Sequence, residues 1–228
     1  MDEPTQAEAG YVELDVPGFL PAVLYVPGPA VTPRPLVVAG HGAGGIPEGE
    51  CDYWRQLTHG SAFLLCLRGA RTDTRWPSGY YYPDHRALER EMLSALAAFD
   101  RHYPGAVDRS ASVYAGFSQG AIMGAAMIPA HARSFPRLVL IEGGYEYWSP
   151  AQARRFARNG GQRVLFVCGT RWCATQAKAP RDWLLAAGVQ ARIEHAEGAG
   201  HTPGGRVMNV TAAALPWVLA GGRAWGPH

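Results

Sequence analysis

Short apolar runs alternate with segments of helical periodicity along most of this chain, and this alternation limits its fold more than any other feature. Runs such as PLVVAG and AFLLCL are typical of strands buried on both faces of a parallel sheet. Strands are expected at residues 11–16, 22–27, 35–40, 62–67, 111–115, 137–142, 163–168 and 189–195. Helices are expected at residues 50–59, 84–102, 118–127, 150–158, 174–187 and 205–219. The alternation predicts an α/β fold, in which helices cover both faces of a mostly parallel eight-stranded sheet.

The size and composition favour one globular domain over residues 1–228, because no repeat or linker divides the sequence. The net charge is only +2, from 21 Lys and Arg against 19 Asp and Glu, which gives no electrostatic reason to expect a nucleic-acid partner. No apolar run approaches the roughly 20 residues that cross a membrane. We therefore expect a small-molecule partner.

The expected compartment follows from the N-terminus and the cysteines. No signal peptide is visible, which favours a cytoplasmic protein, although an exported mature form would look the same. Cys168 and Cys173 lie close enough in sequence to form a disulfide, which an exported protein permits. Reduced, buried thiols are the alternative for all four cysteines.

One serine stands between two glycines where an expected strand turns into an expected helix. The sequence GFSQG spans residues 116–120, directly after the strand at 111–115. At such a turn the glycines leave room for a close approach, and the serine side chain stands clear of the backbone. The alternative is a serine that merely caps the helix. The strand–turn–helix context favours Ser118 as a nucleophile.

A serine hydroxyl needs a base, and His201 lies where the order of the chain requires it. It stands in the sequence EGAGHTPGG, after the last expected strand and after the nucleophile. His41 belongs to a different motif, VAGHGAGG, which follows the strand at 35–40. That turn is expected to supply the amide of Ala43, or else that of Gly44, to a developing oxyanion. The amide of Gln119 is expected to supply the second donor.

These motifs, in this order, resemble the α/β-hydrolase superfamily over about residues 11–220. The chain looks like a small esterase without a lid, of the dienelactone-hydrolase-like or acyl-protein-thioesterase-like kind. Dienelactone hydrolases proper have a cysteine nucleophile, and the serine here favours ordinary esters. The resemblance implies a Ser–His–acid triad, no cofactor and no cap domain.

The acid of the triad is missing from its usual place. In the family it follows the strand that here reads RVLFVC, at the position of Trp172, and no Asp or Glu occurs between Arg163 and Asp182. Glu142, at the end of the preceding strand, is the best replacement, and a solvated surface acid is the alternative reading of that residue. A Ser–His dyad is the remaining possibility. A disulfide between Cys168 and Cys173 would stiffen the vacated loop.

The expected function is hydrolysis of small acyl or aryl esters through an acyl-enzyme on Ser118. Only residues 143–162 separate two core strands, so we expect an open site. Aromatic residues in loops at the carboxyl ends of the strands are expected to line it. They are Trp76, Tyr80, Tyr81, Tyr82, Tyr145, Tyr147 and Trp148. A thioesterase, an amide or peptide hydrolase, and a catalytically silent binding protein are the alternatives.

Overall fold

The structure is a computed structural model that describes residues 9–29, 32–72 and 79–225. Eight strands form one sheet in the order β1-β2-β4-β3-β7-β8-β9-β10. They are β1 (Gly10–Leu14), β2 (Ala22–Val26), β3 (Leu36–Gly40), β4 (Phe63–Leu67), β7 (Val113–Phe117), β8 (Arg137–Ile141), β9 (Arg163–Cys168) and β10 (Gln190–His195). The β1–β2 and β2–β4 pairs are antiparallel and the other pairs are parallel. The predicted fold class is confirmed.

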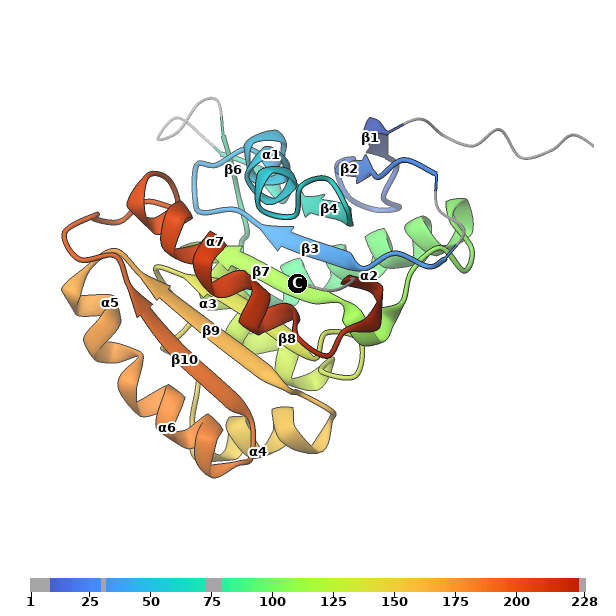
Figure 1. The fold of residues 1–228 in the computed structure, drawn as a ribbon. Helices are drawn as coiled ribbons and strands as arrows, with labels where there is room; N and C mark the ends of the chain where they lie inside the picture. The colour runs from blue at the N-terminus through green and yellow to red at the C-terminus, as the bar shows by residue number, and fades with distance from the viewer. Residues whose placement is uncertain (1–8, 30–31, 73–78, 226–228) are drawn as a thin grey trace, which may run out of the picture.

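Helices cover both faces of the sheet, as Figure 1 shows. The helices are α1 (Pro47–Leu57), α2 (His85–His102), α3 (Gln119–Met127), α4 (Pro150–Arg158), α5 (Arg171–Gln176), α6 (Lys178–Ala186) and α7 (Arg206–Leu219). Side chains of α1 and α7 form one apolar cluster with the sheet, and those of α2, α3, α4 and α6 form another. Along β3, Val37 and Ala39 join the first cluster, whereas Leu36 and Val38 join the second. This alternation is the period of two that a strand buried on both faces requires.

Local sequence signals explain the helix boundaries. The carboxylate of Asp84 accepts the backbone N–H groups of Arg86 and Ala87 and so caps α2, as its position predicts. The helix predicted over 174–187 is instead two helices, α5 and α6. Pro180 explains the break, because proline has no N–H to donate and its ring clashes with a preceding carbonyl unless it lies in the first turn of a helix.

Two short strands lie in the segment predicted as a loop over 69–83. They are β5 (Ala70–Arg71) and β6 (Tyr80–Tyr81), which pair antiparallel. The residues between them, 73–78, lie outside the described part of the chain. The hairpin matters for function because Tyr80 also pairs with Gly45, in the turn after β3.

The four cysteines form two disulfides. Cys51 of α1 is bonded to Cys66 of β4, and Cys168 at the end of β9 is bonded to Cys173 of α5. The reduced-thiol alternative therefore does not describe this structure. No helix among the described residues is long and apolar enough to cross a membrane.

Candidate active site

Ser118 occupies a strained turn between β7 and α3. Its φ of 48° and ψ of −112° are rare for a residue with a side chain, and such strain is typical of functional sites. Gly120 makes the turn possible, because a β-carbon there would collide with the carbonyl of Gly40. The hydroxyl makes no capping hydrogen bond to α3, so the alternative of a simple helix cap does not hold.

The Ser118 hydroxyl meets His201 instead. The Nε2 atom of His201 lies 2.9 Å from Oγ of Ser118, although 83 positions separate the two residues. His201 stands in the loop between β10 and α7, where the preceding Gly200 adopts a φ of 83° that residues with a side chain avoid. The side chain of His201 is 55% exposed, so solvent reaches this end of the site.

Glu142 lies on the other side of the same imidazole. Its Oε2 atom is 3.0 Å from Nδ1 of His201, and its side chain is only 2% exposed. The alternative of a solvated surface acid is therefore wrong. Glu142 has a φ of 52°, which makes it, like Ser118, one of the non-glycine residues with a left-handed backbone. That conformation occurs immediately after β8, where the N–H of Glu142 donates to the carbonyl of Val167 in β9 at 2.9 Å.

The buried carboxylate of Glu142 is held by donors from the loop that follows β9. The backbone N–H of Gly169 donates to Oε1, as does that of Thr170 at 2.8 Å. The hydroxyl of Thr170 donates to Oε2 at 3.0 Å. These donors compensate the carboxylate for its lost hydration and fix its direction toward His201.

Two backbone amides are available beside Ser118. Of the two candidates expected in the turn after β3, the N–H of Gly44 donates to the carbonyl of Tyr80 at 2.8 Å, which leaves Ala43. Within the described part of the chain, neither Ala43 nor Gln119 donates its N–H to another backbone group. The side chain of Gln119 pairs with the backbone of Tyr82 and thereby joins the start of α3 to the residues after β6. The N–H groups of Ala43 and Gln119 therefore have no backbone acceptor, and their role as oxyanion donors stays a prediction.

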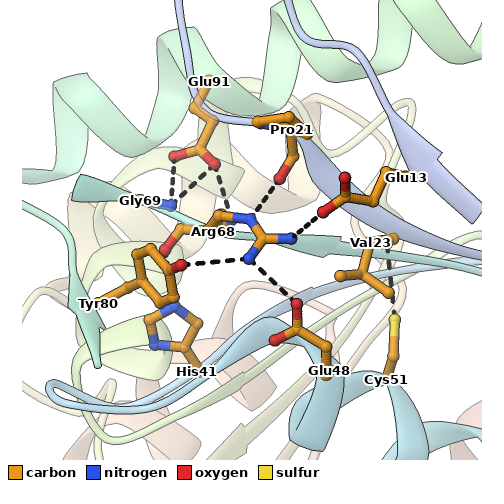
Figure 2. Close-up of polar contacts among 10 residues, drawn as sticks. All are labelled: Glu13, Pro21, Val23, His41, Glu48, Cys51, Arg68, Gly69, Tyr80 and Glu91. Atoms are coloured by element: carbon orange, nitrogen blue, oxygen red, sulfur yellow. Dashed lines mark hydrogen bonds and ion pairs between the residues drawn. The ribbon is translucent and has the colours of Figure 1, made fainter. Parts of the chain in front are cut away.

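Near the turn after β3 lies a hub of polar contacts around the buried side chain of Arg68, which Figure 2 shows. The guanidinium group contacts Glu13 at 3.1 Å, Glu48 at 3.0 Å and the hydroxyl of Tyr80 at 3.3 Å. The carbonyl of Arg68 lies 2.9 Å from Nε2 of His41. The hub therefore supports both His41 and Tyr80, which flank the turn that contains Ala43.

His41 is a structural residue and not a second base. Its side chain stacks on Tyr82, and its Nδ1 atom lies 2.7 Å from the carbonyl of Gly42. Burial lowers the pKa of His41, and hydrogen bonding to the carbonyls of Gly42 and Arg68 opposes that shift. Both ring nitrogens therefore face backbone carbonyls, and neither faces Ser118.

One group of side chains near the site could hold a metal ion by spacing alone. Ligand atoms of Glu142, Cys168 and Cys173 lie within 4.8 Å of one another. Both sulfur atoms belong to a disulfide, however, and zinc binds thiolates. In the oxidised protein this group does not fit a metal.

The expectation of an aromatic-lined cleft fails for three of the residues named and stays a prediction for the others. Tyr80, Tyr82 and Trp148 are buried, so for them the expectation is wrong. Their rings pack in the interior, and the hydroxyls of Tyr80 and Tyr82 bind Arg68 and the carbonyl of Leu67. Tyr147 is 46% exposed, while Trp76 lies outside the described residues.

We compared the chain with protein-family profiles, curated proteins and solved structures. No family profile matches the sequence, and no curated protein is similar to it. Solved structures do match. The fluorophosphonate-binding serine hydrolase F of Staphylococcus aureus superposes with a TM-score of 0.66 at 10% identity, over 93% of this chain and 99% of that one. The chain has the α/β-hydrolase fold.

Other structures with the α/β-hydrolase fold match over similar lengths. Esterase PE8 gives a TM-score of 0.58 at 17% identity, over 91% of this chain and all of that one. The S-formylglutathione hydrolase of Staphylococcus aureus gives 0.64 at 12% identity, over 95% of this chain and 98% of that one. At these identities the likeness concerns the fold that this protein shares with serine esterases, and the activity is argued below.

Proposed function

We propose that this protein is a serine hydrolase that cleaves small carboxylic esters through an acyl-enzyme on Ser118. One observation carries the proposal: a continuous hydrogen-bond chain runs from Oγ of Ser118 through His201 to Glu142. The three residues follow three different strands, β7, β10 and β8. Such a chain is the arrangement that activates a serine hydroxyl in triads on unrelated folds.

Each residue has a defined step. Ser118 Oγ attacks the ester carbonyl while Nε2 of His201 accepts its proton. Charge develops on the carbonyl oxygen, and the amides of Ala43 and Gln119 donate to it. His201 then returns the proton to the leaving alcohol, which leaves the acyl group on Ser118. A water molecule repeats the attack with His201 as base, and the acid departs.

Glu142 has no proton to transfer in this scheme. It accepts the N–H on Nδ1 of His201, which leaves Nε2 free to face Ser118. It also stabilises the imidazolium that forms in each half of the reaction.

The surroundings of the site support small or exposed substrates. Between β8 and β9 the described chain contains only the helix α4, so no large insertion lies there. Ser118 is half-buried and His201 is exposed, which suits an ester presented from solvent. Thioesters and amides would react by the same steps, and the resemblance to an S-formylglutathione hydrolase supports including thioesters in any test.

A panel of 4-nitrophenyl esters, matched thioesters and anilides tests this proposal. We expect hydrolysis with kcat/KM falling from acetate to octanoate, and loss of about 10³-fold or more in Ser118→Ala. Ser94→Ala is the matched control, because its hydroxyl binds the carbonyl of Pro17 on the exposed side of α2. Equal activity in wild type and Ser118→Ala would contradict the proposal.

A further inference from the structure

The loop enclosed by the Cys168–Cys173 disulfide contacts the acid of the site and the residue that precedes the base. Its Gly169 and Thr170 donate to Glu142. The carbonyl of Gly169 accepts the N–H of Gly200 at 3.1 Å, and Gly200 directly precedes His201. This loop therefore sets the position of Glu142 relative to His201.

We propose that the Cys168–Cys173 disulfide and Thr170 act as a clamp that positions Glu142, so that the oxidation state of this cysteine pair controls turnover. The inference rests on the proposed function of the site. Gly169, Thr170 and the two cysteines act through Glu142 and are positioning residues.

The helix that contains Cys173 is short and depends on other contacts for its stability. Helix α5 spans only Arg171–Gln176, and a helix of this length has little stability of its own. The hydroxyl of Thr170 accepts the N–H of Cys173 at 3.2 Å while it donates to Glu142. The disulfide joins the first turn of α5 to the end of β9, with 5.4 Å between the two Cα atoms. The disulfide and the N–H of Cys173 thus fix Thr170 with its hydroxyl toward Glu142.

The clamp also explains why this loop works without an acid of its own. The family pattern would place the acid at Trp172, which here is 66% exposed and lies inside the disulfide-closed loop. The loop instead supplies N–H and O–H donors to a carboxylate from the neighbouring strand, β8. Without those donors, a carboxylate that is 2% exposed would lack the hydrogen bonds that a buried charge requires.

Reduction by a small dithiol would release the clamp. One thiolate of the reductant attacks a sulfur of the pair and forms a mixed disulfide, and its second thiolate closes the reductant's own disulfide. The protein is left with two thiols, and the reductant is oxidised. Cys168 and Cys173 are buried, so the exchange requires local opening of α5. The reduced loop keeps its sequence but loses its covalent closure.

The chain offers a matched control in its second disulfide. Cys51–Cys66 is also buried, but it joins α1 to β4, and Sγ of Cys51 lies beside the carbonyls of Val23 and Leu64 rather than beside Glu142. In Cys168→Ala/Cys173→Ala we expect kcat to fall about tenfold or more, with KM changed less than about twofold, because a small misplacement of catalytic groups slows the chemical step. In Cys51→Ala/Cys66→Ala we expect kcat to stay near the wild-type value. Equal kcat in the two double variants would overturn the proposal.

Thr170 supplies an independent test that does not depend on either disulfide. Thr170→Val removes the hydroxyl and should lower kcat, whereas Thr170→Ser keeps it and should restore wild-type kcat. If Cys168→Ala/Cys173→Ala does not fold, this pair tests the positioning of Glu142, and the effect of dithiothreitol on the wild-type protein tests the role of the disulfide. Wild-type kcat in Thr170→Val would then overturn the proposal.

A double-mutant cycle shows whether the disulfide affects kcat by positioning Glu142 or by stabilising the whole protein. Because the clamp acts through Glu142, adding Cys168→Ala/Cys173→Ala to Glu142→Ala should change kcat by less than about twofold. A further tenfold loss in that background would show a structural role and would overturn the inference. Dithiothreitol should lower kcat reversibly in wild type and in Cys51→Ala/Cys66→Ala, and should have no effect on the Cys168→Ala/Cys173→Ala variant.

Failure of the clamp and failure of the proposed function give different results. A wild-type protein that hydrolyses esters at Ser118, with unchanged kcat in every clamp variant, overturns the clamp alone. A wild-type protein without any reaction at Ser118 overturns the proposed function, and the clamp with it.

Discussion

The carboxylate of Glu142 lies 3.0 Å from Nδ1 of His201, although 59 positions separate the two residues. The carboxylate reaches this position from the end of β8, whereas the family pattern would bring an acid from the end of β9. The two ends are adjacent, since β8 and β9 pair in parallel with Ile141 opposite Val167. The same edge of the sheet can therefore supply the acid from either strand.

Replacing Glu142 by glutamine should lower kcat by about 10²- to 10⁴-fold without unfolding the protein. The amide lacks the negative charge that stabilises the imidazolium, and its NH₂ group can turn toward Nδ1. Steady-state kinetics on a short-chain aryl ester measures the loss. Glu197→Gln is the control, because Glu197 is exposed in the loop before His201. Near-wild-type kcat in Glu142→Gln would remove Glu142 from the proposed triad.

Replacing Arg68 by methionine should lower both stability and turnover. The side chain of Arg68 is 9% exposed, and its guanidinium group binds Glu13, Glu48 and the hydroxyl of Tyr80, so its loss leaves Tyr80 without this donor. We expect a loss of about 1–3 kcal/mol in the free energy of unfolding, because both carboxylates are largely solvated.

The effect on kcat in Arg68→Met should be about tenfold, because Tyr80 holds the turn that contains Ala43. Urea denaturation and steady-state kinetics measure the two effects, with the exposed Arg133→Met as control. Unchanged kcat together with lowered stability would show that the hub does not support the oxyanion turn.

Glu50 should give the protein a stability that depends on pH. This carboxyl is buried in α1 and accepts the indole N–H of Trp54, and burial raises its pKa from 4.5 to about 7. Between these values the folded protein binds a proton that the unfolded chain releases, so stability falls as pH rises through the interval. The stabilisation is fully present below pH 4.5 and is lost above about pH 7.

Glu50→Gln should remove this pH dependence. At pH 8 we expect the variant to be more stable than wild type, by up to about 3 kcal/mol. At pH 4.5 the two proteins should differ little. Urea denaturation at intervals between pH 4.5 and pH 8 measures the difference, and the exposed Glu146→Gln should keep the wild-type slope. Parallel curves for wild type and Glu50→Gln would contradict the assignment.

The fold and the proximity of Ser118 to His201 could be predicted because both depend on local sequence patterns. Apolar runs mark buried strands, and Gly-x-Ser-x-Gly between a strand and a helix has few alternative conformations. The resemblance to the α/β-hydrolase superfamily showed that the usual acid is missing between Arg163 and Asp182, and the place of Glu142 at the end of the preceding strand made it the best replacement. Its catalytic role, like those of Ser118 and His201, stays a prediction that the geometry supports.

Other features depend on distances that no local pattern encodes. The donors from Gly169 and Thr170 reach Glu142 because the ends of β8 and β9 are adjacent in the sheet. The Cys51–Cys66 disulfide depends on how α1 lies over β4. The hub at Arg68 gathers partners from four separate segments, and its arginine has no distinguishing sequence context. The Cys168–Cys173 disulfide was the exception, because the two cysteines visibly stand on either side of the loop that lacks the expected acid.

Reaction of the native protein with a fluorophosphonate, followed by peptide mass spectrometry, tests the central claim most directly. The reagent phosphonylates a serine hydroxyl only where a base and oxyanion donors activate it. We predict one adduct, on Ser118, that is absent from Ser118→Ala and forms much more slowly in His201→Ala. An unmodified Ser118 in the folded wild-type protein would contradict the account.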